Sequence, residues 1–331
     1  MRRRILPLAS FFFLLVGVWA TPAGAGNPAE QTLVRKDLDQ GRADRALDIL
    51  ATTLGQNPKD AEAHNLRCRV YYQEEQWDQA ITDCEAAVQV APGESSFHLW
   101  LGRAYGKKAE HASVLSAYQL ARRVRAEFDQ AVQLDARNAE ALADLGEFEV
   151  MAPVVVGGSM ARAEGVVQQL RGVDPARALD LQARIAEAKK DYASAEADFR
   201  RAIQQSSYPP NAWMDLAAFY RRRGRLDEMV MAAHTGASLD LNHGPALVDG
   251  ASNLALAGRE PQIAIQWLDQ YLNSDAQSEV APAFVVRAQL AGLLQTQGDM
   301  RGAQQQLAEV HVLASAYRVP TPTNAFARSG L

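Results

Sequence analysis

Few residues in this chain have the types and spacing that chemistry requires, and the two cysteines come first among them. Cys68 and Cys84 are the only cysteines in the 331 residues. They lack the Cys-x-x-Cys spacing of redox and zinc motifs, so we expect neither redox catalysis nor metal binding from them. A disulfide between them requires Cα atoms within about 7 Å of each other. Two buried thiols are the alternative.

The other chemical signals are weaker. The six histidines are scattered. His64 and His98 hold equivalent positions in two adjacent repeats of the pattern described below, but no carboxylate or cysteine accompanies them in the sequence. Residues 102–108 superficially resemble a phosphate-binding loop, yet the glycine spacing is wrong, no strand precedes them, and no serine or threonine follows the lysines. There is no Ser-His-Asp arrangement and no dinucleotide fingerprint. The sequence therefore predicts a protein that is not an enzyme and that needs no metal or cofactor.

Arginines recur at a fixed interval, and that interval indicates which elements position them. Arg35, Arg69 and Arg103 are 34 residues apart, and so are Pro58 and Pro92. A period of this length is typical of stacked helical hairpins, in which each repeat is one two-helix unit. Large side chains at helical spacing wedge between the helices, while small residues let two backbones approach closely.

Several segments carry the same repeat pattern. Residues 213–220 read Trp-x-x-Leu-Ala-x-x-Tyr, residues 101–105 read Leu-Gly-x-x-Tyr, and Ala195, Phe199 and Ala202 supply the small-large-small spacing of a second helix. The pattern resembles the tetratricopeptide repeat family over about residues 28–316. The resemblance implies an all-α, right-handed superhelical solenoid of about eight antiparallel helix-turn-helix units. The expected units are 27–60, 61–94, 95–138, 139–175, 176–209, 210–243, 244–279 and 280–316.

Two units exceed the 34-residue step. The third has about ten extra residues, which lengthen its second helix over residues 114–134. The fourth has a longer turn containing Pro153, Val155, Gly157 and Gly158, where the proline ends a helix and the glycines permit a tight return. This apolar loop either folds back onto its own array or projects as a contact that reaches into or beside the groove of the array. Because the long helix of the third unit lies next to it, the two insertions could form one side platform.

The two ends of the chain are expected to lie outside the array. Residues 1–25 combine three arginines, an apolar run and an Ala-Gly-Ala site, which predicts a secretory signal peptide. After its cleavage no membrane insertion is expected, and the product would be periplasmic or extracellular. Residues 317–331 are expected to be a disordered tail. No polar capping helix is evident, so the tail, a second copy or a partner would have to cover the exposed last unit.

The resemblance places the first helix of each hairpin on the concave side, where a protein or peptide partner would bind. Inward positions there would belong to Arg35, Asn65, Arg69, Tyr72, Arg103, Lys107 and Arg184. Because arginine pairs carboxylates with two parallel hydrogen bonds, we expect an extended acidic or C-terminal peptide. The alternative is that each arginine is neutralised within the array, for example Arg35 by Asp39.

Other functions remain open at this point. The chain could be a structural subunit of a cell-envelope assembly or secretion complex, or it could bind a small molecule or glycan through the insertions of units three and four. Its net charge of −5 argues against nonspecific nucleic-acid binding. The sequence does not fix the oligomeric state.

Overall fold

The computed structural model describes residues 27–321, which form sixteen α-helices, one short 3-10 helix and no strand. The expected signal peptide and residues 322–331 of the expected tail lie outside this range. Consecutive helices pack as antiparallel hairpins, so the predicted all-α array is confirmed. The hairpins are α1 Pro28–Asp39 with α2 Ala43–Gln56, α3 Ala61–Gln73 with α4 Trp77–Val90, α5 Ser95–Glu110 with α6 Val114–Leu134, α7 Ala139–Met151 with α8 Met160–Arg171, α9 Pro175–Ala188 with α10 Tyr192–Gln205, α11 Pro209–Arg222 with α12 Leu226–Leu239, α13 Pro245–Leu256 with α14 Pro261–Leu272, and α15 Ala283–Thr296 with α16 Met300–Leu313.

The hairpin of α11 and α12 shows how the sequence specifies one unit. Pro209 and Pro210 occupy the first turn of α11, where a missing backbone N–H costs nothing. The chain turns at Gly224, whose φ of 70° suits glycine. Gly236 of α12 then lies so close to α11 that an added Cβ would fall 2.9 Å from the Met214 and Trp213 side chains. Small residues thus set the distance between the two helices, as the repeat pattern predicts.

The two insertions lie side by side on the outside of the array. The long second helix of the third hairpin, α6, spans the predicted residues and packs Phe128 against Gly102 of α5. In the next hairpin the turn contains the 3-10 helix η1, Val154–Val156, which contacts α6. Val155 is 76% exposed. The loop therefore lies against the long helix and keeps an apolar side chain exposed to solvent.

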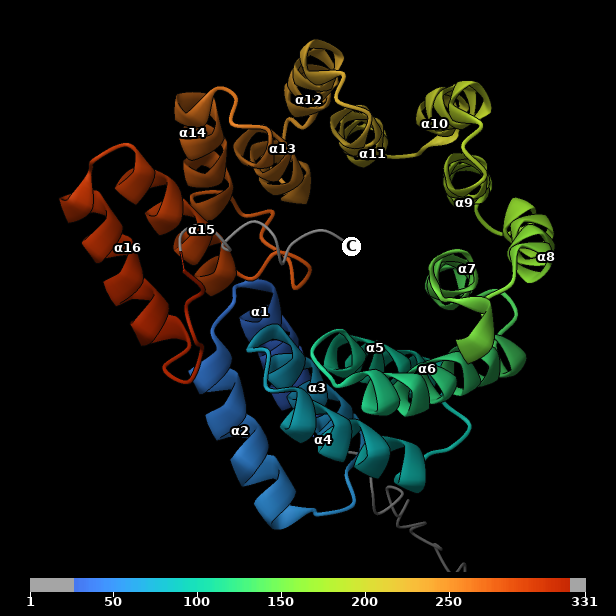
Figure 1. Cartoon of the computed structure of the whole chain (residues 1–331). Helices are drawn as coiled ribbons and strands as arrows, with labels where there is room; N and C mark the ends of the chain where they lie inside the picture. The colour runs from blue at the N-terminus through green and yellow to red at the C-terminus, as the bar shows by residue number, and fades with distance from the viewer. Residues whose placement is uncertain (1–26, 322–331) are drawn as a thin grey trace, which may run out of the picture.

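The array curves round until its last hairpin meets its first (Figure 1). The turn between α1 and α2 lies directly against the start of α15: a Cβ on Gly41 would fall 2.4 Å from the backbone nitrogen of Ala283. Asp44 of α2 accepts a hydrogen bond from the backbone N–H of Ser315, which follows α16. The described part of the chain is therefore a closed ring of hairpins, an arrangement that the 34-residue period does not reveal.

We call the contact between the first and last hairpins the seam. One apolar cluster runs through it and contains Val34, Leu38, Ala43, Ala46, Leu50, Leu54, Ala63, Leu66, Val70, Phe284, Ala288, Val310, Ala314 and Tyr317. The end of the last unit is thus covered mainly by the first hairpin of the same chain, a cover that the sequence does not suggest, and Tyr317 of the expected tail adds to it. The tail also begins later than expected, because Tyr317 is 7% exposed and packs edge-on against Phe284.

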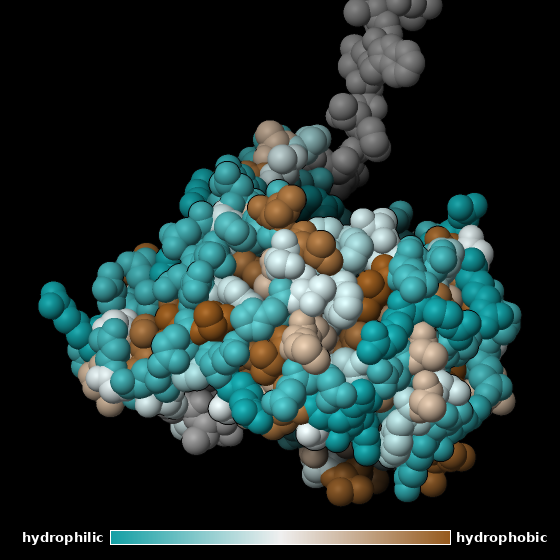
Figure 2. Space-filling view, turned by 90° about the horizontal axis from the view of Figure 1, so that it is seen from above, coloured by the Kyte–Doolittle hydropathy of each residue, from teal (hydrophilic) through white to brown (hydrophobic). Residues whose placement is uncertain are grey.

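One face of the molecule is mainly polar. The face seen in Figure 2 is largely hydrophilic, with hydrophobic side chains in small separate patches. Scattered apolar residues of this kind are normal for a folded protein in water. No helix in residues 27–321 is long and apolar enough to cross a bilayer.

Candidate functional site

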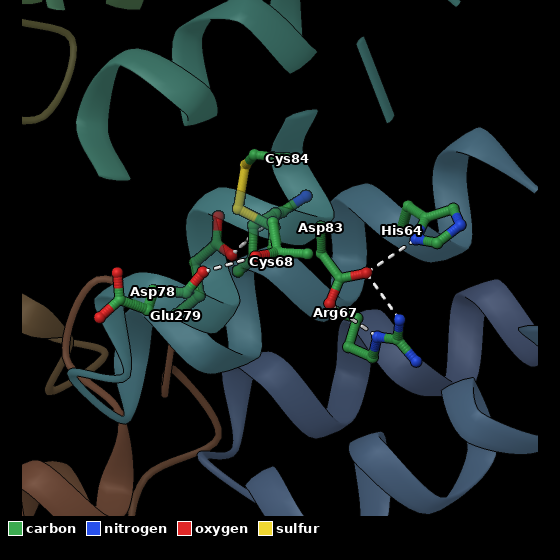
Figure 3. The surroundings of a disulfide bond; sticks show 9 residues. His64, Arg67, Cys68, Asp78, Asp83, Cys84 and Glu279 are labelled. Carbon is green, nitrogen blue, oxygen red and sulfur yellow. Dashed lines mark hydrogen bonds and ion pairs between the residues drawn. A yellow bond between two sulfur atoms is a disulfide. The ribbon is translucent and has the colours of Figure 1, made fainter. Parts of the chain in front are cut away.

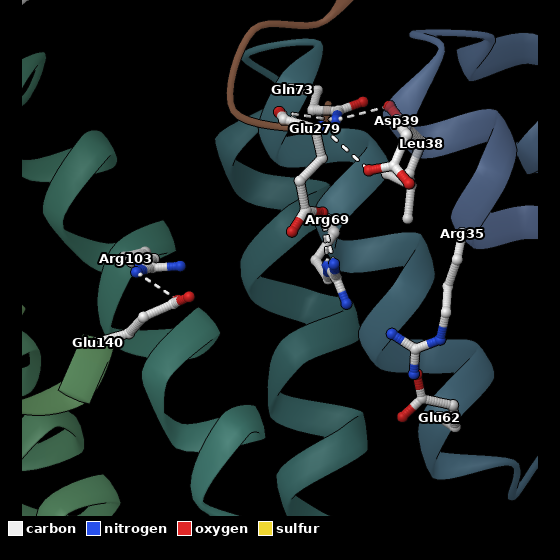
Figure 4. A network of polar contacts seen from close by, with 9 residues as sticks. All are labelled: Arg35, Leu38, Asp39, Glu62, Arg69, Gln73, Arg103, Glu140 and Glu279. Carbon is white, nitrogen blue, oxygen red and sulfur yellow. Dashed lines mark hydrogen bonds and ion pairs between the residues drawn. The ribbon is translucent and has the colours of Figure 1, made fainter. Parts of the chain in front are cut away.

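The candidate site is the inner face of the ring, formed by the first helix of each hairpin. In Figure 1 α7, α9, α11 and α13 line the inside of the curve, and α8, α10, α12 and α14 lie outside them. Arg35, Arg69 and Arg103 project from the corresponding helices of the first three hairpins (Figure 4). Equivalent positions of successive repeats are therefore brought together along one surface.

Three of the predicted arginines are neutralised by acidic residues of neighbouring inner helices, and Arg35 and Arg103 show the pattern. The guanidinium of Arg35 binds Glu62 on the next inner helix at 2.5 Å, in place of Asp39. Arg103 binds Asp144 at 2.6 Å and Glu140 at 3.1 Å, both on the following inner helix. Each guanidinium thus links one repeat to the next.

Arg184 is the third and has the densest set of acidic partners. It binds Asp180 on its own helix at 2.7 Å, Glu147 on the preceding inner helix at 3.2 Å and Asp215 on the following one at 3.5 Å. The Coulombic attraction of Asp180 is the largest of the effects that raise the pKa of Arg184, which stays charged. Asp249 of α13 holds the position equivalent to Asp215 on the next inner helix. It has no ion-pair partner in residues 27–321, and desolvation raises its pKa to about 7.

Arg69 departs from this pattern. Where α7 presents Asp144 to Arg103, α5 presents Trp100 to Arg69, and the guanidinium carbon lies 5.0 Å from the centre of the indole ring. The acidic partner of Arg69 is Glu279, 210 residues away, which accepts from Nε at 3.0 Å and from Nη2 at 2.5 Å. Arg69 is 13% exposed at its side chain. This arginine therefore joins the two ends of the ring.

Aromatic residues surround these arginines. Trp100 lies between two guanidiniums, because Arg103 covers its ring at 4.8 Å. Tyr72 packs edge-on against Trp100 and Trp77, with ring centroids 5.5 Å apart in both cases. Burial raises the pKa of the Tyr72 hydroxyl above its usual range. The cation-π contacts hold both arginines in fixed positions on the inner face.

The remaining predicted residues have smaller roles on this surface. Asn65 is 2% exposed because α3 is packed between α1 and α5, so it offers no surface to a ligand. Lys107 binds Glu110 within the same helix at 3.3 Å. In the fourth hairpin, Gly157 has a φ of 110° and its carbonyl accepts from Arg162, so Pro153, Val155, Gly157 and Gly158 shape the projecting loop and not the inner face.

The two cysteines form a disulfide across the second hairpin (Figure 3). The Cα atoms of Cys68 and Cys84 are 5.3 Å apart, which two helices reach where small residues separate them. Beside the bond, Asp83 accepts from His64 at 2.7 Å and from Nε of Arg67 at 2.8 Å. The histidine thus has a carboxylate partner, on the facing helix, that its own stretch of sequence does not show.

The turn of the same hairpin contains a buried acid with a testable pH dependence. Glu74 is 2% exposed, and burial, followed by repulsion from Asp44, raises its pKa to about 7. The folded state therefore holds its proton more tightly than the unfolded state, so stability falls as the pH rises from about 4.5 to above 7. We expect Glu74→Gln to be about 1–2 kcal/mol more stable than the wild type at pH 8 and equal to it at pH 4.5. Urea unfolding at both pH values measures this, and an advantage that does not change with pH would contradict it.

A shallow hollow beside the long helix is the other feature of note. Lys108, Tyr118, Arg122 and Arg123 contribute to its lining. Lys108 forms an ion pair with Asp78, and Arg123 with Glu85 at 3.6 Å. The hollow is open to solvent and has a basic rim.

Comparisons with known proteins agree with this architecture. Residues 37–82 match the family model described as tetratricopeptide repeat. Among curated proteins no sequence matches significantly. A thermophilic tetratricopeptide repeat protein from Thermus thermophilus superposes with a TM-score of 0.50 at 18% identity, over 58% of this chain and 97% of that one. Yeast Tom70 gives 0.54 at 14% identity, over 93% of this chain and 65% of that one.

At these identities the solved structures are evidence of a shared fold only. The matched segment contains α2 and α3, the end of α1 and the start of α4, and similar hairpins follow it through the ring. Residues 37–82 thus match a tetratricopeptide repeat, and the described residues share the fold of solved tetratricopeptide repeat structures.

Proposed function

We propose that the chain is an exported, noncatalytic scaffold that holds a segment of a protein partner against the inner face of its ring. Repeat arrays of this fold serve as protein-interaction scaffolds. The observation that carries the proposal is the cluster of Tyr72, Trp100, Arg69 and Arg103, in which aromatic rings hold two guanidiniums on a preformed surface. Preformed surfaces bind with a small loss of conformational entropy. The expected leader at residues 1–25 supports export.

The chemistry of the partner follows from how the arginines are paired. Each guanidinium already binds a carboxylate of the chain, so an acidic or C-terminal peptide would bind by exchanging one carboxylate for another. Such an exchange keeps the half-buried guanidinium paired, and an unpaired buried charge would be costly. Arg103 and Arg69 are 22% and 13% exposed, so an incoming carboxylate would bind in a partly desolvated site where charge-assisted hydrogen bonds are strong.

Photocrosslinking in the producing cells tests the proposal. A benzophenone amino acid replaces Tyr72 on the inner face in one variant and Val90, 43% exposed on the outer helix α4, in the matched control. We expect a discrete crosslinked protein from position 72 and none from position 90. Crosslinks from the outer position alone would contradict capture on the inner face, and would favour a structural subunit of an envelope assembly.

The hollow beside α6 supports a second candidate, the binding of an anionic small molecule or glycan. Its guanidinium groups at Arg122 and Arg123 are the relevant observation. Native mass spectrometry of the purified chain measures this directly. A bound small molecule that is lost in Arg122→Ala would support the second candidate, and an unliganded mass would exclude a retained ligand.

A further inference from the structure

We propose that the loop 273–282 is a peptide ligand held in cis, and that Glu279 occupies an acidic-residue site whose filling closes the ring. The site is formed by Arg69 and Gln73 of α3 and Asp39 of α1. An acidic residue of a partner would compete with Glu279 for it. The inference rests on the proposed capture of a protein segment at the inner face, and it names the residue type captured and the internal occupant that must leave.

All three polar groups of Glu279 are bound by the first two hairpins (Figure 4). Its carboxylate accepts from Nε and Nη2 of Arg69. Its backbone carbonyl accepts from Nε2 of Gln73 at 3.1 Å, and its backbone N–H donates to Oδ1 of Asp39 at 3.3 Å. Recognition of side chain, carbonyl and amide together is how a surface holds a residue of a bound peptide.

The other arginines of the series make a simpler contact. Arg35 donates hydrogen bonds only to the side chain of Glu62, and Arg103 only to the side chains of Asp144 and Glu140. Their acidic partners belong to neighbouring inner helices, whereas Glu279 belongs to an irregular loop. The site at Arg69 therefore differs from the repeated ion pairs, because it binds an extended segment through its backbone as well.

The conformation of the loop 273–282 is stabilised by hydrogen bonds to Tyr271 of α14, within the C-terminal part of the ring, and not by the seam. The hydroxyl of Tyr271 donates to the carbonyl of Ala281 at 2.7 Å and accepts from the backbone N–H of Ser278 at 2.9 Å. Tyr271 is fully buried in α14. Glu279 lies between Ser278 and Ala281 and its side chain contacts α3, whereas Val280 is 77% exposed. The contact with α1 and α3 is thus polar, which suits exchange with another carboxylate.

Competition between the loop and a partner has a measurable consequence. Because the loop is tethered, it binds at the high effective concentration of an intramolecular ligand. The apparent affinity for a free acidic peptide therefore equals the intrinsic affinity multiplied by the fraction of molecules in which the site is vacant. Removing the carboxylate of Glu279 raises that fraction and should reveal the site.

The test uses a synthetic fluorescein-labelled peptide of residues 273–282 as the probe. By fluorescence anisotropy we expect it to bind Glu279→Ala at least about tenfold more tightly than the wild-type chain. The same peptide with glutamine at position 279 should not bind, and added salt should weaken the binding that remains. Glu62→Ala is the matched control: it frees the Arg35 guanidinium but provides no partners for the peptide backbone, so we expect no gain.

Equal affinity for Glu279→Ala and the wild type, or an equal gain in Glu62→Ala, would overturn the inference. A second measurement uses the wild-type chain and does not depend on folding of a variant. Hydrogen exchange at the amide of Glu279, which donates to Asp39, should accelerate on addition of the peptide, and an unchanged rate at saturating peptide would also overturn it. These results are separable from the proposed function. If a partner crosslinks at position 72 but leaves the exchange rate of the Glu279 amide unchanged, the scaffold function is supported and the loop is not a ligand held in cis.

Discussion

Replacing Phe284 with alanine is expected to destabilise the chain by about 3–5 kcal/mol and to separate the two ends of the ring. Phe284 is fully buried, its ring lies 4.9 Å from that of Tyr317, and its neighbours in the seam cluster come from α1, α2 and α16. Its removal leaves a cavity between elements that no backbone connection holds together. Urea unfolding measures the loss of stability, and hydrogen exchange measures where it occurs.

Phe219→Ala provides the matched control. Phe219 is equally buried but belongs to the cluster of α9 to α15, away from the seam. We expect a similar loss of stability from both variants but faster exchange in α1 and α2 only from Phe284→Ala. If α1 and α2 exchange at the same rate in the two variants, the first hairpin does not depend on the last.

Loss of the disulfide is the second large effect that we expect. A bridge closing a loop of about 15 residues is worth about 3 kcal/mol, chiefly through restriction of the unfolded chain, and Cys68 and Cys84 are 16 residues apart. Both are fully buried at positions where the helices meet closely, so alanine fits without a clash. We expect the double variant Cys68→Ala, Cys84→Ala to unfold at correspondingly lower urea.

Reductant supplies the control for this prediction. Wild-type chain unfolded with dithiothreitol present should match the double variant, whose own midpoint should not respond to dithiothreitol. A wild-type midpoint that is identical with and without reductant would show that the bridge contributes nothing to stability.

Much of the architecture could be predicted because it is local. The 34-residue period, the glycine at the turn after α11 and the small residues between paired helices all act within one or two hairpins. The extra residues of the third unit continue the helical spacing without a break, so the bounds of α6 could be predicted from the sequence. Cys68 and Cys84 could be placed on facing helices for the same reason.

The closure of the ring could not be predicted, because nothing local distinguishes the residues that make it. Gly41 and Gly258 both end a helix with φ near 60°, yet only Gly41 lies against another hairpin. Closure depends on the small rotation between repeats, summed over the whole array. Glu279 lies outside the repeat period, in a polar stretch between α14 and α15. The only sequence feature that hints at its pairing with Arg69 is that Trp100 stands where the next repeat has the acidic Asp144.

The same limit applies to the partners of the arginines. Asp39 lies one helical turn from Arg35 and is its natural partner within one helix. The structure instead assigns Glu62 to Arg35, because the next inner helix brings that carboxylate to 2.5 Å. Contacts between repeats thus decide the charge balance of the inner face, and they depend on the superhelical geometry.

A distance between spin labels on α2 and α16 shows whether the two ends of the array meet. Labels at Asp48→Cys and Glu309→Cys, both exposed, report on the seam without entering it. We expect one narrow distribution at short distance, which broadens and lengthens when Gly41→Ala is added, because the new Cβ collides with Ala283. Gly258→Ala, which has open space around it, should leave the distribution unchanged. A long, broad distribution in the otherwise wild-type chain would show an open solenoid and contradict the account.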